Sequence, residues 1–236
     1  MTLPSQFPLP FPHRPAYEAA KFLPAPSNEA ALTWLERTAA WPDHRLALWG
    51  EAGVGKTHLL HVWTARNAAM LLHGPALRAP EPVPLPAGVA IDDADGAADE
   101  TALLHWLNTA RENGVPVLLA ARLPPARWAV RLPDLASRLR AITAVPIGPP
   151  EDALLRDLLA RLLTERRLRR DPALEGWLLL RLPRSPAALR EAVVRLDHAA
   201  WSAGSGINRR LAAAVVTAMG GSEPEAELDS QASPPP

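Results

Sequence analysis

Short apolar runs alternate with segments of helical periodicity through the first 150 residues. Strands are predicted by five apolar runs, at 45–49, 70–73, 89–91, 115–121 and 142–145. Helices are predicted where apolar residues recur every three or four positions, near 28–38, 57–67 and 99–113, and Ser27 and Asn28 are candidate N-caps for the first. Strands that alternate with helices predict a parallel sheet covered on both faces, so the expected fold class is α/β.

The pattern changes after Pro149-Pro150. Residues 151–219 show helical periodicity without a strand, and four helices are predicted, at 152–168, 172–182, 186–203 and 208–218. Seven prolines within residues 1–26 favour an extended arm. We therefore expect four parts: an extended arm (1–15), an α/β domain (16–150), a small all-helical domain (151–219) and a disordered acidic tail (220–236).

Composition excludes several classes of protein. The chain has 25 basic and 25 acidic residues, which argues against a dedicated polyanion binder, and it has no cysteine for disulfides or zinc–thiolate sites. No apolar run is long enough to span a bilayer, and no basic lead precedes one, so we expect a cytoplasmic protein without membrane partners. Charge is uneven: residues 151–219 carry 12 basic and 8 acidic side chains, and the tail carries four acids.

A phosphate-binding loop is predicted directly after the first strand. Residues 50–57 read Gly-Glu-Ala-Gly-Val-Gly-Lys-Thr, which matches G-x-x-x-x-G-K-[ST]. Glycines let successive backbone N–H groups point at a phosphate, and Lys56, one of only two lysines in the chain, would contact the β and γ phosphates. The candidate nucleotide-binding residues are Gly50, Glu51, Ala52, Gly53, Val54, Gly55, Lys56, Thr57 and His58.

Two aspartates follow the predicted strand at 89–91. Thr57 and Asp92 are the candidate ligands for Mg²⁺, with Asp92 acting through water, and Asp93 is the candidate that polarises an attacking water. The alternative is an Asp-rich turn, because Asp95 lies close by in sequence.

Three stretches carry a resemblance to the DnaA-related AAA+ family. Residues 50–61 (GEAGVGKTHLLH) resemble the phosphate loop of DnaA, residues 132–139 (LPDLASRL) resemble its arginine-finger segment, and residues 22–28 (FLPAPSN) resemble its adenine side. The resemblance covers residues 16–219. It implies a P-loop AAA+ αβα sandwich with a parallel sheet, followed by a helical lid, and it implies ADP or ATP with Mg²⁺ as the cofactor.

The pattern departs from DnaA at both ends. The folded pattern stops near Met219 without a helix-turn-helix domain, and residues 6–11 (QFPLPF) are similar to peptides that bind the DNA polymerase sliding clamp (beta subunit). The candidate clamp-binding residues are Gln6, Phe7, Leu9, Pro10 and Phe11. This combination is similar to the Hda family of DnaA regulatory inactivators. The similarity implies a bacterial, replisome-associated protein that binds the clamp, reaches DNA indirectly through it, and stimulates hydrolysis of DnaA-bound ATP to prevent re-initiation.

The resemblance assigns the distinctive chemistry to Arg138. It implies an arginine finger, which reaches into a neighbouring subunit's nucleotide site and stabilises the transferred phosphoryl group. The alternative is a solvated helix residue among other arginines. Two departures, Arg122 after the strand at 115–121 and Ala187 where DnaA carries a sensing arginine, indicate weak intrinsic ATP hydrolysis, with ADP as a structural organiser. Arg184 and Arg190 both stay open as substitutes for that arginine.

Two other functions remain as alternatives. One is a DnaC-like helicase loader, and the other is a nucleotide-bound, non-catalytic adaptor for the clamp. The sequence leaves open the preference for ADP or ATP and whether the chain associates with itself.

Overall fold

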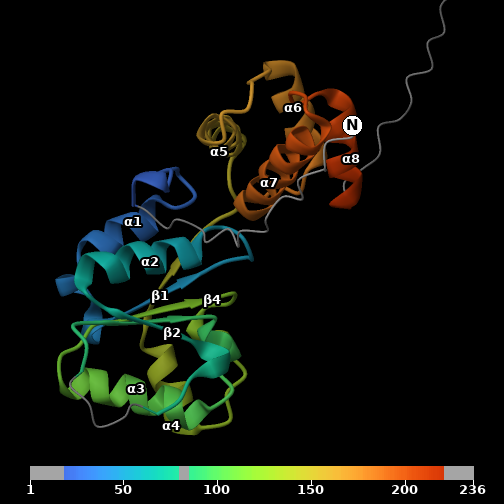
Figure 1. Ribbon diagram of the computed structural model, residues 1–236. Helices are drawn as coiled ribbons and strands as arrows, with labels where there is room; N and C mark the ends of the chain where they lie inside the picture. The colour runs from blue at the N-terminus through green and yellow to red at the C-terminus, as the bar shows by residue number, and fades with distance from the viewer. Residues whose placement is uncertain (1–18, 80–84, 221–236) are drawn as a thin grey trace, which may run out of the picture.

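The computed structural model describes residues 19–79 and 85–220, which form an α/β part and a helical part (Figure 1). Five parallel strands make one sheet in the order β2-β3-β4-β1-β5. Their bounds are β1 (Arg45–Trp49), β2 (Met70–His73), β3 (Val89–Asp92), β4 (Val117–Ala121) and β5 (Thr143–Pro146). Because β4 lies between β1 and β3, the loops after these three strands meet at one edge of the sheet, its carboxyl edge.

Helices cover both faces of the sheet. Those of the α/β part are α1 (Glu29–Glu36), α2 (Lys56–Asn67), α3 (Glu100–Glu112) and α4 (Pro133–Arg140). In Figure 1, α1 and α2 lie on one side of the strands, and α3 and α4 lie on the other. Short 3₁₀ helices occur at Ala19–Lys21, Thr38–Ala40, Pro42–His44, Gly74–Ala76, Ala94–Gly96 and Pro125–Arg127.

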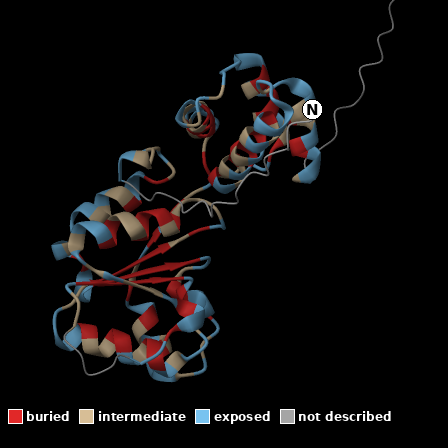
Figure 2. Ribbon diagram, in the orientation of Figure 1, coloured by how far each residue is buried: buried red, intermediate tan, exposed pale blue. Residues whose placement is uncertain are grey.

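Alternate residues of each inner strand belong to different cores. Leu46 and Leu48 of β1 pack on the α1/α2 side with Trp63, whereas Ala47 packs on the α3/α4 side with Leu135. The same alternation runs along β4, which is buried throughout. Figure 2 shows the result as buried strands between helices that are buried on their inner sides. A strand covered on both faces needs apolar residues at consecutive positions, which explains the apolar runs in the sequence.

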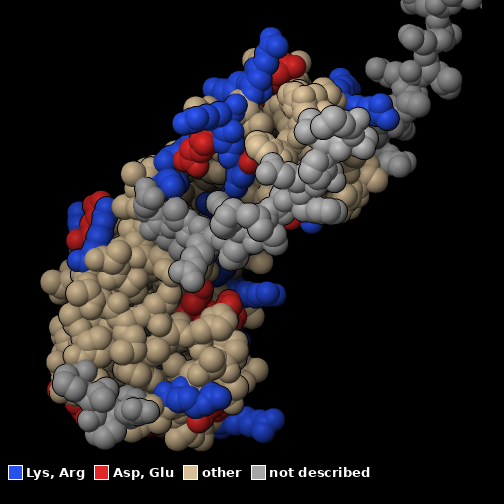
Figure 3. All heavy atoms as spheres, in the orientation of Figure 1, with Lys and Arg blue, Asp and Glu red and all other residues tan. Residues whose placement is uncertain are grey.

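The helical part has a core of its own. It consists of α5 (Asp152–Glu165), α6 (Pro172–Arg181), α7 (Pro186–Ala203) and α8 (Arg209–Ala218). Leucines from the first three helices pack with Val215 and Val216 of α8. We call this part the lid, and Figure 3 shows many basic side chains on its visible outer face, all of them arginine because this part contains no lysine.

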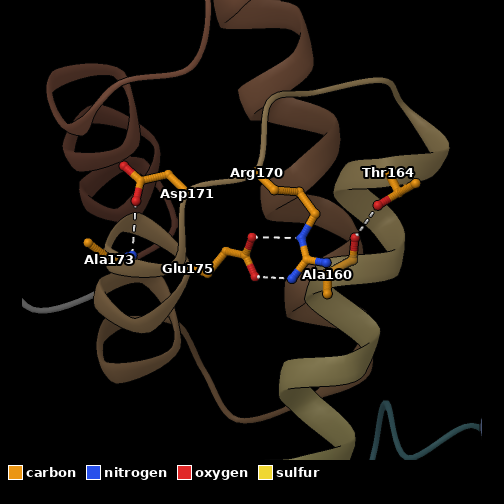
Figure 4. A network of polar contacts seen from close by, with 6 residues as sticks. All are labelled: Ala160, Thr164, Arg170, Asp171, Ala173 and Glu175. Carbon is orange, nitrogen blue, oxygen red and sulfur yellow. Dashed lines mark hydrogen bonds and ion pairs between the residues drawn. The ribbon is translucent and has the colours of Figure 1, made fainter.

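Side-chain caps and one ion pair define the corner between α5 and α6 (Figure 4). Asp171 accepts a hydrogen bond from the backbone N–H of Ala173 and caps α6. Just before it, Arg170 donates two hydrogen bonds of 2.9 Å to the carboxylate of Glu175. Such a bidentate pair fixes the path of the chain more strongly than a single contact would.

The predicted fold class is confirmed, and most element bounds lie within three residues of those predicted. The strands at 45–49 and 70–73 and the helix at 186–203 match the structure. Two predicted helices are too long: α1 ends at Glu36 because Arg37 leaves the helical region, and α5 ends at Glu165, shortly before Arg167 adopts a positive φ of 56°. Helix α4 was not predicted, since eight residues with three charges give a weak periodic signal.

Two predicted features lie outside the described residues. They are the clamp-like segment at Gln6–Phe11 and most of the acidic tail. Among the helices that the structure describes, none combines the length and hydropathy needed to cross a bilayer.

Candidate nucleotide-binding site

The loop between β1 and α2 has the backbone of a phosphate-binding loop. Gly53 and Gly55 take positive φ values of 84° and 108°, which a residue with a side chain rarely adopts. Within the described residues, the backbone N–H groups of Gly53, Val54 and Gly55 have no acceptor. Successive unpaired N–H groups in such a turn, placed at the start of a helix, form a concavity that suits an anion.

Lys56 bends back over this loop. Its ammonium group donates hydrogen bonds of 2.6 Å to the carbonyl oxygen of Gly50 and 2.7 Å to that of Glu51. The side chain is only 8% exposed, and burial lowers the pKa of Lys56 from its ordinary value, although the nearby carboxylate of Asp92 opposes the shift. The loop therefore holds a buried, well-partnered cation beside the unpaired N–H groups.

Thr57 and Asp92 lie side by side, although 35 positions separate them in sequence. The Thr57 hydroxyl donates a 2.8 Å hydrogen bond to Oδ2 of Asp92, which is buried at the end of β3. A hydroxyl and a carboxylate next to a phosphate-binding loop fit Mg²⁺, which takes oxygen ligands and keeps several waters. Among the described residues, no group of three or more His, Cys, Asp or Glu side chains could hold a metal ion by itself. The donor set therefore suits a metal that is held partly by phosphate oxygens.

The other two aspartates after β3 have different neighbours. Asp93, with φ 47°, places its half-exposed carboxylate 3.9 Å from Nε2 of His73, at the end of β2. Asp95 accepts a 2.9 Å hydrogen bond from the backbone N–H of Arg122, at the end of β4. The carboxyl edge therefore joins the loops after β2, β3 and β4, and Arg122 stands beside this acidic cluster.

The segment before α1 forms one wall of the loop. A Cβ atom added to Gly55 would lie 3.0 Å from the Phe22 ring, and this ring also meets His58 edge-on at 5.3 Å. Asn28 was predicted as an N-cap but makes no cap hydrogen bond. Its buried side chain instead accepts from the N–H of Ala25 and donates to the carbonyl of Leu23, which fixes the turn that carries Phe22.

The lid closes the loop from the opposite side. A Cβ atom added to Gly53 would lie 3.2 Å from Cβ of Ala187 and 3.4 Å from Cβ of Ser185, at the start of α7. Arg184, one of the two arginines that the sequence left open, forms an ion pair with Asp152 of α5. The lid atoms next to Gly53 therefore belong to small, uncharged residues.

Arg138 lies away from this loop. It occupies the last turn of α4, which leads into the start of β5, and its guanidinium is 3.3 Å from Asp134 one turn earlier. The phosphate-binding loop follows the end of β1, which pairs in parallel with β5. Arg138 and the loop are thus separated by the length of a five-residue strand, about 16 Å. We call the edge at which Arg138 lies the amino edge of the sheet.

Comparison with known proteins identifies the fold. Domain III of the replication initiation protein DnaA from Thermotoga maritima matches with a TM-score of 0.72 and 17% identity, over 89% of this chain and 99% of that chain. A replication initiator DnaA bound to AMPPCP and single-stranded DNA matches with a TM-score of 0.63 and 15% identity, over 77% of this chain. The RuvB Holliday junction branch migration motor of Thermotoga maritima matches with a TM-score of 0.57 and 17% identity, over 81% of this chain.

This chain spans about two thirds of the longer structures, 64% of the DnaA chain and 66% of the RuvB chain. No protein-family model matches the sequence. At these identities the similarity defines the fold, which is the AAA+ fold of DnaA domain III: a P-loop αβα sandwich followed by a helical lid.

The structure brings together part of the predicted site. Residues 50–58 and Asp92 form one cluster, and Arg138 lies apart from it. Sequence reasoning missed the roles of Asn28, Ser185 and Asp95, each of which fixes a wall of the site. For Asn28 the signal was present but ambiguous, because a polar residue before a helix is typical of a cap.

Proposed function

We propose that this protein is a nucleotide-dependent regulator of replication initiation. In this proposal it binds the DNA polymerase sliding clamp through Gln6, Phe7, Leu9, Pro10 and Phe11, and stimulates hydrolysis of ATP bound to a DnaA-type initiator. Support comes from a fold that matches DnaA domain III over nearly all of that domain. The position of Arg138, remote from its own phosphate-binding loop, is the observation that carries the proposal.

The loop would hold an adenine nucleotide. The N–H groups of residues 53–55 would contact phosphate oxygens. Lys56 would leave the carbonyl oxygens of Gly50 and Glu51 and donate to phosphate oxygens instead. Thr57 and Asp92 would hold Mg²⁺, which neutralises phosphate charge when bound. Phe22 and His58 would stand on the adenine side. A DnaA bound to AMPPCP shares the fold, which supports an adenine nucleotide as the ligand.

Intrinsic hydrolysis is expected to be slow. Asp93, the residue proposed to polarise water, has a half-exposed carboxylate beside His73, and the lid places Ala187 next to Gly53. Neither residue supplies a positive charge to a transferred phosphoryl group. We therefore propose that the bound nucleotide, ADP in particular, organises the loop, Phe22 and the lid. Rapid steady-state ATP turnover by the isolated protein would contradict this role.

Arg138 would act on the partner's nucleotide. A guanidinium aimed at a neighbouring subunit's γ-phosphate stabilises charge that develops during phosphoryl transfer, and such residues contribute roughly 10³–10⁵-fold in rate. Arg138 donates two long, exposed hydrogen bonds of 3.3 and 3.4 Å to one carboxylate oxygen of Asp134, and an exposed pair of that kind is worth little. The side chain can therefore leave Asp134 for a phosphate at small cost.

The decisive experiment measures hydrolysis of DnaA-bound ATP on DNA that carries a loaded clamp. We expect the wild-type chain to accelerate hydrolysis, and Arg138→Ala to lose on the order of 10³-fold of that acceleration. Arg140→Ala is the matched control, because Arg140 is exposed in the same helical turn but points to another side. Unchanged acceleration by Arg138→Ala, with clamp binding intact, would refute the assignment.

Clamp binding is tested separately. In a pull-down with purified clamp, Gln6→Ala/Leu9→Ala should lose binding while nucleotide affinity stays unchanged. Capture of a replicative helicase instead of the clamp would favour the helicase-loader alternative. Clamp binding without any stimulation of DnaA would favour the non-catalytic adaptor.

A further inference from the structure

Arg45 is a buried cation that the nucleotide site does not use. It opens β1, its side chain is 4% exposed, and its Nη2 atom is enclosed with no hydrogen-bond acceptor within the described residues. Burial lowers the pKa of the Arg45 guanidinium from its ordinary value. An enclosed charge without a partner is costly, and native structures normally pair it. Arg45 therefore needs an anion that the described chain does not supply at Nη2.

Two further arginines lie at the same corner of the sheet. Arg45 is in register with Val117, the first residue of β4, and its neighbour Leu46 is in register with Thr143, the first residue of β5. Helix α3 leads into β4 and α4 leads into β5, so the ends of both helices lie at the amino edge beside Arg45. Arg111 is in the last turn of α3, and Arg138 is in the last turn of α4.

The three side chains also share one face of the sheet. Ala47 belongs to the core under α3 and α4, and residues two apart on a strand point to the same face. Arg45 is therefore directed toward the side of α3 and α4. The charges of Arg111 and Arg138 both lower the pKa of Arg45, and the carboxylate of Asp43 opposes them.

Local structure explains why Arg111 and Arg138 are found at their positions, but it does not explain Arg45. Arg111 and Arg138 lie in the last turns of helices, where a positive charge interacts favourably with the helix dipole. Arg45 has no such role, because it begins a strand and is enclosed. The nearby carboxylates are Asp43 and Asp134, and both are exposed, so the corner keeps an excess of positive charge.

We propose that Arg45, Arg111 and Arg138 form a polyphosphate seat, which takes the phosphate chain of a nucleotide presented by a partner subunit. This inference rests on the proposed function and adds two residues to the action of Arg138. A ligand with one carboxylate would not neutralise the positive charge of three guanidinium groups. A triphosphate carries several negative charges on adjacent groups, and its oxygens match the geometry of guanidinium donors. Arg138 would contact the phosphates, Arg111 would flank them, and Arg45 would act from beneath as a positioning residue.

Thermal unfolding of the full chain with inorganic tripolyphosphate tests the seat without any DnaA. The variants are Arg45→Met and Arg111→Met, and Arg66→Met, an exposed arginine of α2, is the control. The chain's own phosphate-binding loop is unchanged in all of them, so it contributes equally. We expect tripolyphosphate to raise the unfolding midpoint of the wild type and the control, and to raise it by less than half as much in both seat variants.

The midpoint without tripolyphosphate gives a second readout. Replacing an unpaired buried charge by an apolar group of similar length should raise the midpoint of Arg45→Met by about 2 °C or more, which a structural ion pair would not do. An equal tripolyphosphate response in wild type, Arg45→Met and Arg111→Met overturns the proposal. If Arg45→Met does not fold, the exposed Arg111→Met decides by the same criterion. An equal response to an oligoglutamate of matching charge would overturn the assignment to phosphate.

Failure of the seat and failure of the proposed function give different results in these experiments. If the shift of the unfolding midpoint by tripolyphosphate is the same without Arg45 or Arg111, and Arg138→Ala loses DnaA stimulation, the seat is refuted and the arginine finger is retained. A response that depends on Arg45 and Arg111, together with full stimulation by Arg138→Ala, leaves the seat and removes the finger.

Discussion

A buried cation lies at each end of β1, and the two cations differ in their hydrogen-bond partners. At the carboxyl edge, Lys56 is 8% exposed and donates to two loop carbonyls, with Asp92 nearby. At the amino edge, Arg45 is 4% exposed and its Nη2 atom lacks an acceptor in the described chain. The partners of Lys56 are two loop carbonyl oxygens, which a phosphate could replace. Among the described residues, Nη2 of Arg45 has no such partner, and in the proposed seat the compensating charge comes from the bound phosphates.

Under the two proposals, a single strand would serve two nucleotides. The carboxyl edge of this parallel sheet gathers loops and a helix N-terminus, which together form the candidate nucleotide site. The amino edge gathers helix C-termini, where cations are locally favourable. In the proposed arrangement, one end of the strand would bind a phosphate and the arginines at the other end would be directed at a partner's phosphates.

Among variants of the chain's own nucleotide site, the largest expected effect is at Lys56. Lys56→Ala should lower affinity for adenine nucleotide by about 10–100-fold, because a charged hydrogen-bonding group is worth about 1.5–3 kcal/mol. Titration calorimetry with ADP and Mg²⁺ measures the change. The tripolyphosphate response that depends on Arg45 should persist in this variant, and its disappearance would mean that the two edges are not separate sites.

Asn28→Ala should have the next largest effect. Losing both hydrogen bonds leaves the N–H of Ala25 and the carbonyl of Leu23 unpaired, at a cost of about 1–3 kcal/mol in stability. Phe22 should then be held less firmly against Gly55, so nucleotide affinity should fall as well. Denaturant unfolding and calorimetry measure the two effects. Thr33→Ala, on the exposed side of α1, is the control, and equal effects of both substitutions would contradict this role of Asn28.

A moderate effect is expected at Gly53. Gly53→Ala forces a side chain into a positive φ and into the narrow space before Ala187 and Ser185, so the lid should shift away from the loop. Nucleotide affinity should fall by about 10-fold, equivalent to about 1.4 kcal/mol. Gly114→Ala also takes a positive φ but meets no neighbouring atom, so it controls for backbone strain alone. An equal affinity loss in both variants would exclude the lid contact as the cause.

The smallest effect concerns Glu100, which holds the segment before α4. Its carboxylate accepts hydrogen bonds from the N–H groups of Arg131 and Leu132, and these bonds lower the pKa of Glu100 from its ordinary value. A carboxyl with a lowered folded-state pKa stabilises the protein above its unfolded-state pKa, and this contribution is lost as the pH falls through the folded-state value.

Glu100→Gln should therefore narrow the stability difference between pH 7 and pH 3, measured by thermal unfolding. Glu112→Gln, at the exposed end of the same helix, is the control. An identical pH profile for wild type and Glu100→Gln would show that this contact, which joins the start of α3 to the segment before α4, does not contribute to stability.

The sequence predicted the carboxyl edge better than the amino edge, and the reason is physical. A phosphate-binding loop needs glycines, a lysine and a hydroxyl at consecutive positions, so its signal is local. The seat around Arg45 draws single residues from a strand and two helices, and its partners meet only once the sheet order is known. Arg45 itself looked ordinary, since charged residues often begin a strand and stay exposed.

Local patterns were also limited where one side chain has two uses. Asn28 stands at a helix start, where its residue type indicates a cap, yet its amide fixes the preceding turn instead. Helix α4 carries Leu135 and Leu139 four residues apart, too short a pattern to distinguish from a loop. For Asn28 the choice lies between two local hydrogen-bond patterns, whereas α4 depends on the packing of its two leucines in the core.

Phe22 and Leu23 are adjacent in sequence but pack on different parts of the molecule. Phe22 joins the core of the α/β part, and Leu23 joins the core of the lid. Phe22 lies eleven positions after Phe11, and a fully extended chain of eleven residues spans at most about 40 Å. A clamp bound at Gln6–Phe11 would thus lie within a short distance of the dipeptide Phe22-Leu23, which contacts both parts of the molecule. A displacement of this dipeptide on clamp binding would act on the phosphate-binding loop and on the lid at the same time.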